Sequence, residues 1–238
     1  STTPFIEGKA EATAMAFCSL YEEGAFGEEF ADYHPVFFVP FPQTNIHMKD
    51  APITSVRDLA GKKVATGSPV AAAIVSANGG SPLSVILPEQ YQALQRGNAD
   101  GTFMNYTAFP GFKLHEVTTD HLDVPLGGAT GMVFMLKSRY EALSDDAKAA
   151  LDANGGCDKT REVGAIVDQW EADSKGFVMS QEGHTFNEVD PNELAALQEN
   201  VFPMIVQGFD ERVPGGADLV AKWQEAVSAA RAELGDGS

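Results

Sequence analysis

The segment from residue 51 to residue 106 constrains the fold most strongly, because short apolar runs alternate there with helical ones. Strands are predicted at KKVAT, SPLSVI and DGTFMN, and helices between them at PVAAAIVSA and PEQYQALQR. Pro69 and Pro88 suit the first turns of these helices, and Gly79 and Gly97 suit their ends. This succession of strands and helices is typical of a parallel α/β unit.

Ligands of parallel α/β sheets bind beyond the carboxyl ends of the strands. In this sequence those ends fall at residues 65–68, 85–87 and 103–106. We therefore expect the ligand-binding residues of this chain to gather near these three places.

Three sequence motifs follow one another inside this segment: DLxGKK-V, PxxxxxxxxxGGxP and LPEQYQALQRGxxDG. Their order and interval resemble those of the solute-binding proteins of TRAP transporters, the DctP-like family. The matching residues are Asp58, Leu59, Gly61, Lys63, Val64, Tyr91, Ala93, Leu94, Gly97, Asp100 and Gly101.

The resemblance implies an α/β, periplasmic-binding-protein-like fold with two lobes, a long connecting helix and ligand capture by closure. It further implies a periplasmic receptor, without cofactor, metal or catalytic residues, that delivers a small organic acid to the membrane subunits of a TRAP-type permease.

One position departs from the family pattern. Family members usually carry an arginine directly after the strand motif, and this arginine clamps the ligand carboxylate; here the position is Ala65. An arginine side chain that forms two parallel hydrogen bonds binds a carboxylate more strongly at neutral pH than any other side chain does. Three interpretations follow. The ligand is not a simple carboxylate, another group of the protein binds the carboxylate, or ligand binding is lost.

The candidate ligand-binding residues lie at the strand ends and in two segments that the resemblance places near the cleft. Asn105 has an amide that can donate to a carboxylate or keto oxygen. Aromatic candidates favour a ligand with an apolar or aromatic side chain. The resemblance is strongest for the family members that bind keto or hydroxy acids, so it implies a ligand of that kind. The full set is Phe103, Asn105, Tyr106, Thr66, Ser68, Phe134 and Phe41.

The formal net charge is −18, which disfavours nucleic acid and anionic lipid as partners. No apolar run is long enough to span a bilayer, so we expect no direct membrane insertion, and no signal peptide is recognised. Cys18 and Cys157 form neither a metal motif nor a disulfide framework, and we do not expect them to be bonded to each other. His115 and His121 lack metal-ligand spacing and are expected to be structural or exposed.

We expect residues 1–35 to be a helical remnant of a first lobe, and residues 36–125 to form a second α/β lobe. Residues 126–238 should contain a strand returning to the first lobe, a long spanning helix and the C-terminal helices. The family's opening strands have no counterpart here, so the first lobe should be incomplete. We also expect the strand ATGMVFML to be buried on both faces and Trp170 to lie in the core.

Two other functions were considered. An enzyme with an unrecognised site is disfavoured because the chain has no G-x-S-x-G elbow, no dinucleotide or phosphate loop and no zinc spacing. A truncated remnant that binds nothing is the other alternative, because a missing part of the first lobe would remove part of the cleft.

Overall fold

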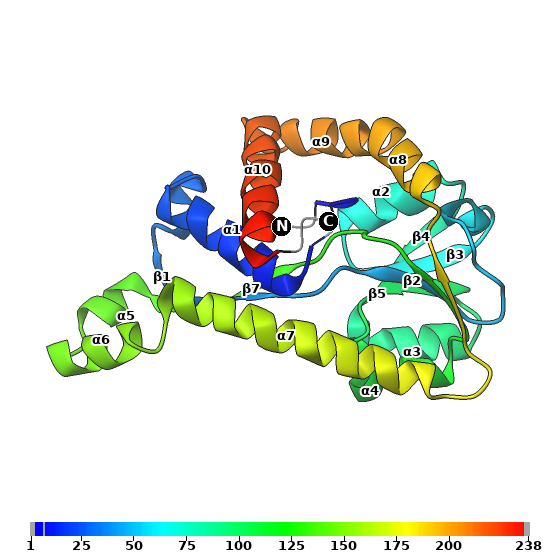
Figure 1. Ribbon diagram of the computed structural model, residues 1–238, viewed down its shortest axis with the longest axis horizontal. Helices are drawn as coiled ribbons and strands as arrows, with labels where there is room; N and C mark the ends of the chain where they lie inside the picture. Colours follow the sequence, from blue (N-terminus) through cyan, green and yellow to red (C-terminus); the bar gives the residue numbers. More distant parts are fainter. Residues whose placement is uncertain (1–2, 7, 236–238) are drawn as a thin grey trace.

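The computed structural model describes residues 3–6 and 8–235, and it shows two separate sheets with one long helix running alongside both (Figure 1). The larger sheet has the order β4-β3-β5-β2-β6-β8. Its strands are β2 (Asn45–Met48), β3 (Lys63–Thr66), β4 (Ser81–Ser84), β5 (Gly101–Met104), β6 (Asp120–Asp123) and β8 (Thr185–Glu188).

The parallel unit expected from the sequence is present. Strand β3 pairs in parallel with β4 and with β5, and α2 (Pro69–Ala77) and α3 (Leu87–Gln95) connect them. The Ser68 hydroxyl caps α2 by accepting a hydrogen bond from the Ala71 N–H at 3.1 Å. Gly79 follows α2 with a φ of +76°, a conformation that favours glycine and stops the helix. Because β3 and β5 pair in parallel, their carboxyl ends lie side by side, and we call this end of the two strands the edge of the sheet.

The two faces of this sheet are covered by different core clusters. Val64 belongs to one cluster together with α2 residues, whereas the next residue, Ala65, belongs to the other, together with residues of α3 and α4 (Ala108–Phe112). Both side chains are fully buried. Ala65 therefore lies within the packed core of the sheet.

The smaller sheet is a ribbon of β1 (Tyr33–Pro40) and β7 (Thr130–Leu136), which pair antiparallel. The expectation that ATGMVFML is buried on both faces is wrong: Val133, Phe134 and Leu136 are 42%, 50% and 50% exposed. The reason is that, in the described part of the chain, β7 pairs with β1 alone and the ribbon is packed mainly on one side, where Phe38 and Met132 belong to a core cluster.

The long helix α7 (Gly156–Met179) confirms the expected spanning helix and extends from the ribbon to the far side of the larger sheet (Figure 1). Its buried face includes Gly164, Val167 and Val178. Trp170 lies off this face and is 48% exposed, so the expectation of a core tryptophan is wrong. The apolar periodicity alone did not show how narrow the covered stripe of α7 is.

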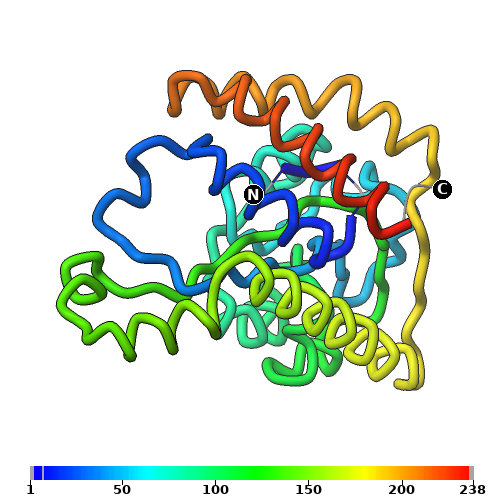
Figure 2. Tube along the Cα trace, turned by 60° about the vertical axis from the view of Figure 1, so that its left-hand side comes forward, coloured from blue at the N-terminus to red at the C-terminus, as the bar shows by residue number. Residues whose placement is uncertain are grey.

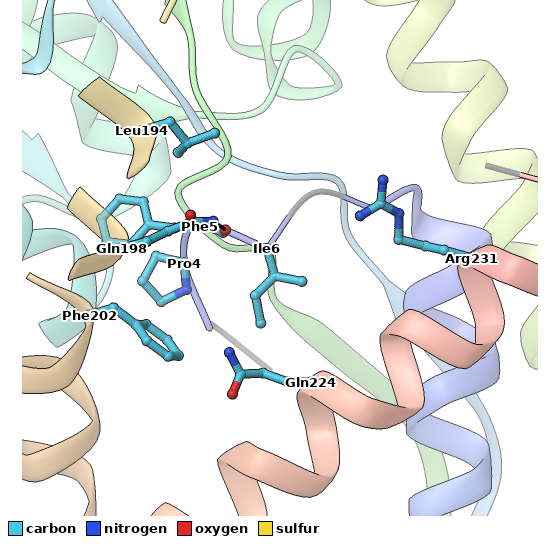
Figure 3. Close-up of a pocket in the computed structure, with 8 residues that line it drawn as sticks. All are labelled: Pro4, Phe5, Ile6, Leu194, Gln198, Phe202, Gln224 and Arg231. Atoms are coloured by element: carbon cyan, nitrogen blue, oxygen red, sulfur yellow. Dashed lines mark hydrogen bonds between the residues drawn. The ribbon is translucent and has the colours of Figure 1, made fainter. Parts of the chain in front are cut away.

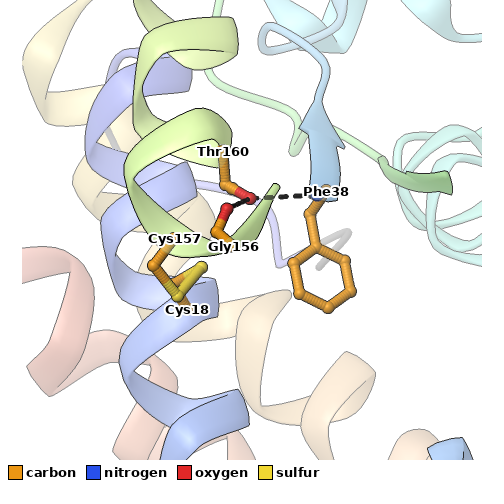
Figure 4. The surroundings of a disulfide bond; sticks show 5 residues. All are labelled: Cys18, Phe38, Gly156, Cys157 and Thr160. Atoms are coloured by element: carbon orange, nitrogen blue, oxygen red, sulfur yellow. Dashed lines mark hydrogen bonds between the residues drawn. A yellow bond between two sulfur atoms is a disulfide. The ribbon is translucent and has the colours of Figure 1, made fainter. Parts of the chain in front are cut away.

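Helix α1 (Ala10–Glu22) packs along α7, and Cys18 and Cys157 form a disulfide between the two helices (Figure 4). The expectation of unbonded cysteines is wrong, because a separation of 139 residues in sequence does not measure the distance between two packed helices. Beside the disulfide, Thr160 accepts a hydrogen bond from the Phe38 N–H at 3.0 Å, which joins α7 to the ribbon.

The C-terminal helices form an arch over the molecule (Figures 1 and 2). Asp190 caps α8, and the chain breaks between α8 and α9 just before Pro203. Among residues 3–6 and 8–235, no helix combines the length and apolar character needed to cross a bilayer. The remaining helical elements are α5 (Lys137–Glu141), α6 (Asp145–Asp152), α8 (Pro191–Asn200), α9 (Phe202–Asp210), α10 (Gly216–Leu234), η1 (Gly27–Phe30), η2 (Val56–Leu59) and η3 (Leu114–Glu116).

Candidate functional site

The turn that follows β5 holds Asn105 in a defined orientation. Glu171 of α7 accepts hydrogen bonds from the backbone N–H groups of Tyr106 and Thr107, at 3.0 and 2.8 Å. The Thr107 hydroxyl in turn donates to Oδ1 of Asn105 at 2.5 Å. Because Oδ1 is engaged, the Asn105 amide nitrogen remains a donor that can serve a ligand.

Glu171 is held in an environment that disfavours its charge. Burial raises the pKa of this carboxyl from 4.5 to about 7, and the nearby Asp123 adds to the rise. The two backbone donors and Lys175 act in the opposite direction and lower the pKa. Glu171, which holds the turn after β5, therefore has a carboxyl group whose protonation changes near neutral pH.

Phe103 and Tyr106 are buried beneath this turn, on opposite faces of the sheet. The Tyr106 hydroxyl donates to Oδ1 of Asp123 at 2.8 Å. Lys175 of α7 pairs with Asp123 and lies over the Tyr106 ring, 5.8 Å from its centre. Both aromatic side chains pack in the core of the structure that supports Asn105.

Thr66 and Ser68 lie at the end of β3, the strand next to β5. Thr66 is 4% exposed and its hydroxyl lies 3.5 Å from the Leu83 carbonyl oxygen, while Ser68 caps α2. The structure thus brings Thr66, Ser68 and Asn105 to the same edge of the larger sheet.

Phe41 and Phe134 lie outside this edge. Phe41 follows β1, and its backbone N–H donates to the Ala129 carbonyl at 2.7 Å. The Phe134 ring is half exposed on the ribbon and stands edge-on to Tyr33, with 5.0 Å between the ring centres. Phe134 is therefore presented on the ribbon and not at the strand ends.

Of the two histidines with a predicted structural or exposed role, His121 lies in a buried chain of rings. Its Nδ1 lies 2.8 Å from Nδ1 of His47, and its Nε2 lies 2.8 Å from Nδ1 of His184. Burial lowers the pKa of His47 to about 4 and that of His121 to about 2. His115 packs its ring edge-on against Phe177. In the described part of the chain, no His, Cys, Asp or Glu side chains form a group of three that could hold a metal ion.

A cavity of about 610 Å³ lies between the N-terminal segment and helices α8 to α10 (Figure 3). Phe5 anchors that segment: its N–H donates to the Pro125 carbonyl at 2.6 Å, and its carbonyl accepts from Gln198 at 2.7 Å. The lining residues are Pro4, Phe5, Ile6, Leu194, Gln198, Phe202, Gln224 and Arg231.

A second cavity has a volume of about 290 Å³, and we call it the α2–α10 cavity. Its lining includes Pro69 and Val70, the two residues that follow Ser68 in the sequence. It is bounded by the start of α2 and by α1, α9 and α10, and its lining is mostly aromatic and aliphatic. The candidate residues predicted from the sequence are not among those that line it. Its lining residues are Thr3, Phe17, Leu20, Phe26, Pro69, Val70, Phe202, Ile205, Val206, Phe209, Arg212, Val213, Leu219, Val220 and Trp223.

Sequence reasoning did not find the α2–α10 cavity. The C-terminal helices showed an amphipathic pattern, which predicts that their apolar faces pack against something but not what they leave open. The available signal was the mostly apolar run from Phe202 to Phe209.

Two α/β sheets with a long helix alongside both form the fold seen in solute-binding receptors of the periplasmic-binding-protein type. The family of bacterial extracellular solute-binding proteins, family 7 (DctP), matches residues 43–211, so the chain belongs to that family. Its members are transport receptors that work with TRAP membrane subunits and are not enzymes.

Solved structures of TRAP solute-binding proteins share this fold. One from a marine metagenome, specific for aromatic acid ligands and bound to 3-hydroxybenzoate, is 26% identical, with a TM-score of 0.87 over 96% of this chain and 73% of that one. A Rhodoferax ferrireducens protein with copurified benzoate is 22% identical, with a TM-score of 0.88 over 98% of this chain and 74% of that one. A Bordetella bronchiseptica protein with bound mandelate is 20% identical, with a TM-score of 0.78 over 94% of this chain and 73% of that one. The predicted family and fold class are confirmed.

Proposed function

We propose that this chain captures a small organic acid at the edge where β3 and β5 end and presents it to a TRAP permease. The observation that carries the proposal is the oriented Asn105 amide, whose Oδ1 is engaged by Thr107 and whose nitrogen remains a donor. An amide nitrogen donates well to a carboxylate or keto oxygen. Thr66 and Ser68, at the adjacent strand end, are proposed to complete this edge.

We propose an acid with an apolar or aromatic side chain as the ligand. The marine metagenome relative binds 3-hydroxybenzoate, and the Rhodoferax and Bordetella proteins hold benzoate and mandelate. Phe103 and Tyr106 would support the site from below, while Phe41 and Phe134 would contribute only if the ribbon closes toward the edge. The division of the chain at residues 35 and 125 remains a prediction.

We propose a periplasmic location for this receptor. The support is the disulfide between Cys18 and Cys157, because disulfides persist in oxidising compartments such as the bacterial periplasm and are rare in the cytosol.

The proposal is tested by thermal unfolding against a panel of keto, hydroxy, aromatic and uncharged analogues. A ligand at 100 times its dissociation constant stabilises the folded chain by about 2.7 kcal/mol, which shifts the midpoint visibly. In Asn105→Asp the acceptor for Thr107 is kept but the donor is replaced by a negative oxygen, so affinity should fall by about tenfold or more. Asn98→Ala, at an exposed turn, is the matched control. A chain that unfolds cooperatively and responds to no acid contradicts the proposal.

A further inference from the structure

The side chain of Glu171 joins the long helix α7 to the turn that carries Asn105. Each of its carboxylate oxygens accepts one backbone N–H, Oε1 from Tyr106 at 3.0 Å and Oε2 from Thr107 at 2.8 Å. The Thr107 hydroxyl donates in turn to Oδ1 of Asn105 at 2.5 Å. Glu171 is therefore connected to the proposed ligand donor through a single intervening residue.

The two backbone donors are the main groups that stabilise the ionised form of Glu171. Glu171 belongs to none of the ion pairs found among residues 3–6 and 8–235. Lys175, one helical turn further along α7, pairs instead with Asp123 of β6, which also accepts from the Tyr106 hydroxyl at 2.8 Å. Burial and the charge of Asp123 oppose ionisation of Glu171, while Lys175 favours it. The charge of Glu171 thus depends chiefly on the turn that Glu171 holds.

Protonation of Glu171 weakens its bonds to this turn. A hydrogen bond to an ionised acceptor is roughly twice as strong as one between neutral groups. A protonated carboxyl also carries a hydrogen on one oxygen, and that oxygen accepts a backbone N–H less well. Burial raises the pKa of Glu171 to about 7, so the change falls near neutral pH. The ionised form is therefore the one that holds the Asn105 turn firmly.

We propose that Glu171 is a positioning residue for ligand capture, which holds the Asn105 turn ready for the ligand when it is ionised and loosens it when it is protonated. This inference rests on the proposed function and deepens it, because it adds proton-linked regulation of the same site. Ligand affinity should fall as the pH falls through about 7. Repulsion between a ligand carboxylate and ionised Glu171 would act in the opposite direction. We expect positioning to prevail, because the backbone donors contact Glu171 directly, whereas the ligand reaches it through Asn105.

Calorimetric titration with mandelate at pH 8 and pH 5.5 tests the inference. Mandelate is ionised at both values, because a carboxyl group ordinarily has a pKa of about 4. The wild-type chain should bind it about three- to thirtyfold more weakly at pH 5.5, the range open to one group with a pKa of about 7. His47, whose ring packs edge-on against Tyr106, stays neutral over this range because burial lowers its pKa to about 4.

Glu171→Gln keeps the shape of the side chain but is neutral at both pH values. Its one oxygen can accept only one of the two backbone N–H groups, so it should bind mandelate weakly and equally at both pH values. Glu199→Gln, at an exposed glutamate of α8, is the matched control and should keep the wild-type pH dependence. Mandelamide, which has no charge, should lose affinity for the wild-type chain at pH 5.5 as mandelate does.

Three results overturn the inference: no mandelate binding by the wild-type chain at pH 8, an affinity that is unchanged or higher at pH 5.5, or a fall of the same size in Glu171→Gln. The last result would leave Glu171 with a structural role alone. The proposed function fails separately, when no acid of the wider panel stabilises the wild-type chain. Should Asn105→Asp weaken an acid whose wild-type affinity is the same at both pH values, the proposed function stands and the role of Glu171 is rejected.

A second measurement covers the case in which thermal melts show that Glu171→Gln does not fold. The backbone amide shifts of Tyr106 and Thr107 in the wild-type chain, followed by NMR from pH 5.5 to pH 8, should move together with a midpoint near 7. Constant shifts of both amides would overturn the inference without any ligand.

Discussion

Asp168 and Glu171 stand three residues apart on α7, and each carboxylate accepts two backbone N–H groups from a different part of the molecule. Asp168 accepts from Ala10 and Glu11 at the start of α1, at 2.7 and 2.9 Å. Glu171 accepts from the turn before α4 at 3.0 and 2.8 Å. One turn of α7 therefore fixes two segments. One is the start of α1, and the other is the turn that carries Asn105.

The first prediction concerns the pH dependence of Glu171. Its pKa in the folded chain is raised from 4.5 to about 7, so folding favours the protonated form. The stability linked to this group is present below pH 4.5 and is lost as the pH rises through about 7, with a loss of up to about 3 kcal/mol in the free energy of unfolding. Glu171→Gln should lack this loss. Urea unfolding at pH 5 and pH 8 measures it, with the exposed Glu199→Gln as control. Equal pH dependence in wild type and Glu171→Gln would contradict the assignment.

The second prediction uses two glycines of α7 that the sequence does not distinguish. A Cβ on Gly164 would lie 2.7 Å from the Glu11 Cα, whereas a Cβ on Gly176 would meet nothing within 4 Å. Gly164→Ala should therefore push α1 away and lower the free energy of unfolding by about 1–3 kcal/mol. Gly176→Ala should raise it by up to about 1 kcal/mol through helix propensity. Denaturant unfolding of both variants decides, and a stabilised Gly164→Ala would refute the close approach of α1.

The third prediction concerns the disulfide. It closes a loop with a sequence separation of 139 residues, and loops of this size gain several kcal/mol in the chain-entropy account. We expect Cys18→Ala/Cys157→Ala to unfold with a free energy about 2–5 kcal/mol lower than the oxidised wild type. Chemically reduced wild type serves as the control and should behave like the double variant. A reducing agent that leaves the unfolding curve unchanged would show that the bond is not formed in solution.

The fourth prediction concerns the buried histidines. Burial lowers the pKa of His47 to about 4, below the ordinary value of 6.5. The corresponding stability is present above pH 6.5 and is lost as the pH falls through about 4, because the unfolded chain takes up the proton first. Nitrogen chemical shifts recorded by NMR should show His47 and His121 neutral at pH 5, and the urea-unfolded chain at the same pH serves as the reference. Titration of His47 near pH 6.5 would rule out the buried chain of rings.

Local sequence patterns are sufficient to predict much of the fold. The segment from β3 to β5 was predicted with its strands, helices and helix ends, because each sits within a few residues of its own signals, such as Pro69 and Gly79. Parallel pairing followed from the spacing, and the structure shows it.

What failed depended on contacts between distant segments. The exposure of Trp170 and of β7 is decided by what covers them, and the Cys18–Cys157 bond by the packing of α1 on α7. The α2–α10 cavity is formed by four helices, so no single stretch of sequence contains its signal. For the candidate site, the sequence predicts the strand end that carries Asn105 but not the role of Glu171, whose carboxylate accepts hydrogen bonds from the next two backbone N–H groups.

The row of rings formed by His47 of β2, His121 of β6 and His184 just before β8 has one more consequence, because the Met104 carbonyl selects the tautomers of the two fully buried histidines, His47 and His121. Nε2 of His47 lies 3.0 Å from the Met104 carbonyl oxygen, so this nitrogen must carry the hydrogen and Nδ1 must accept. His121 must then donate from Nδ1 and accept at Nε2, and His184 must donate from Nδ1. The hydrogens that join these rings thus all point the same way across the sheet, from its partly exposed edge toward its centre.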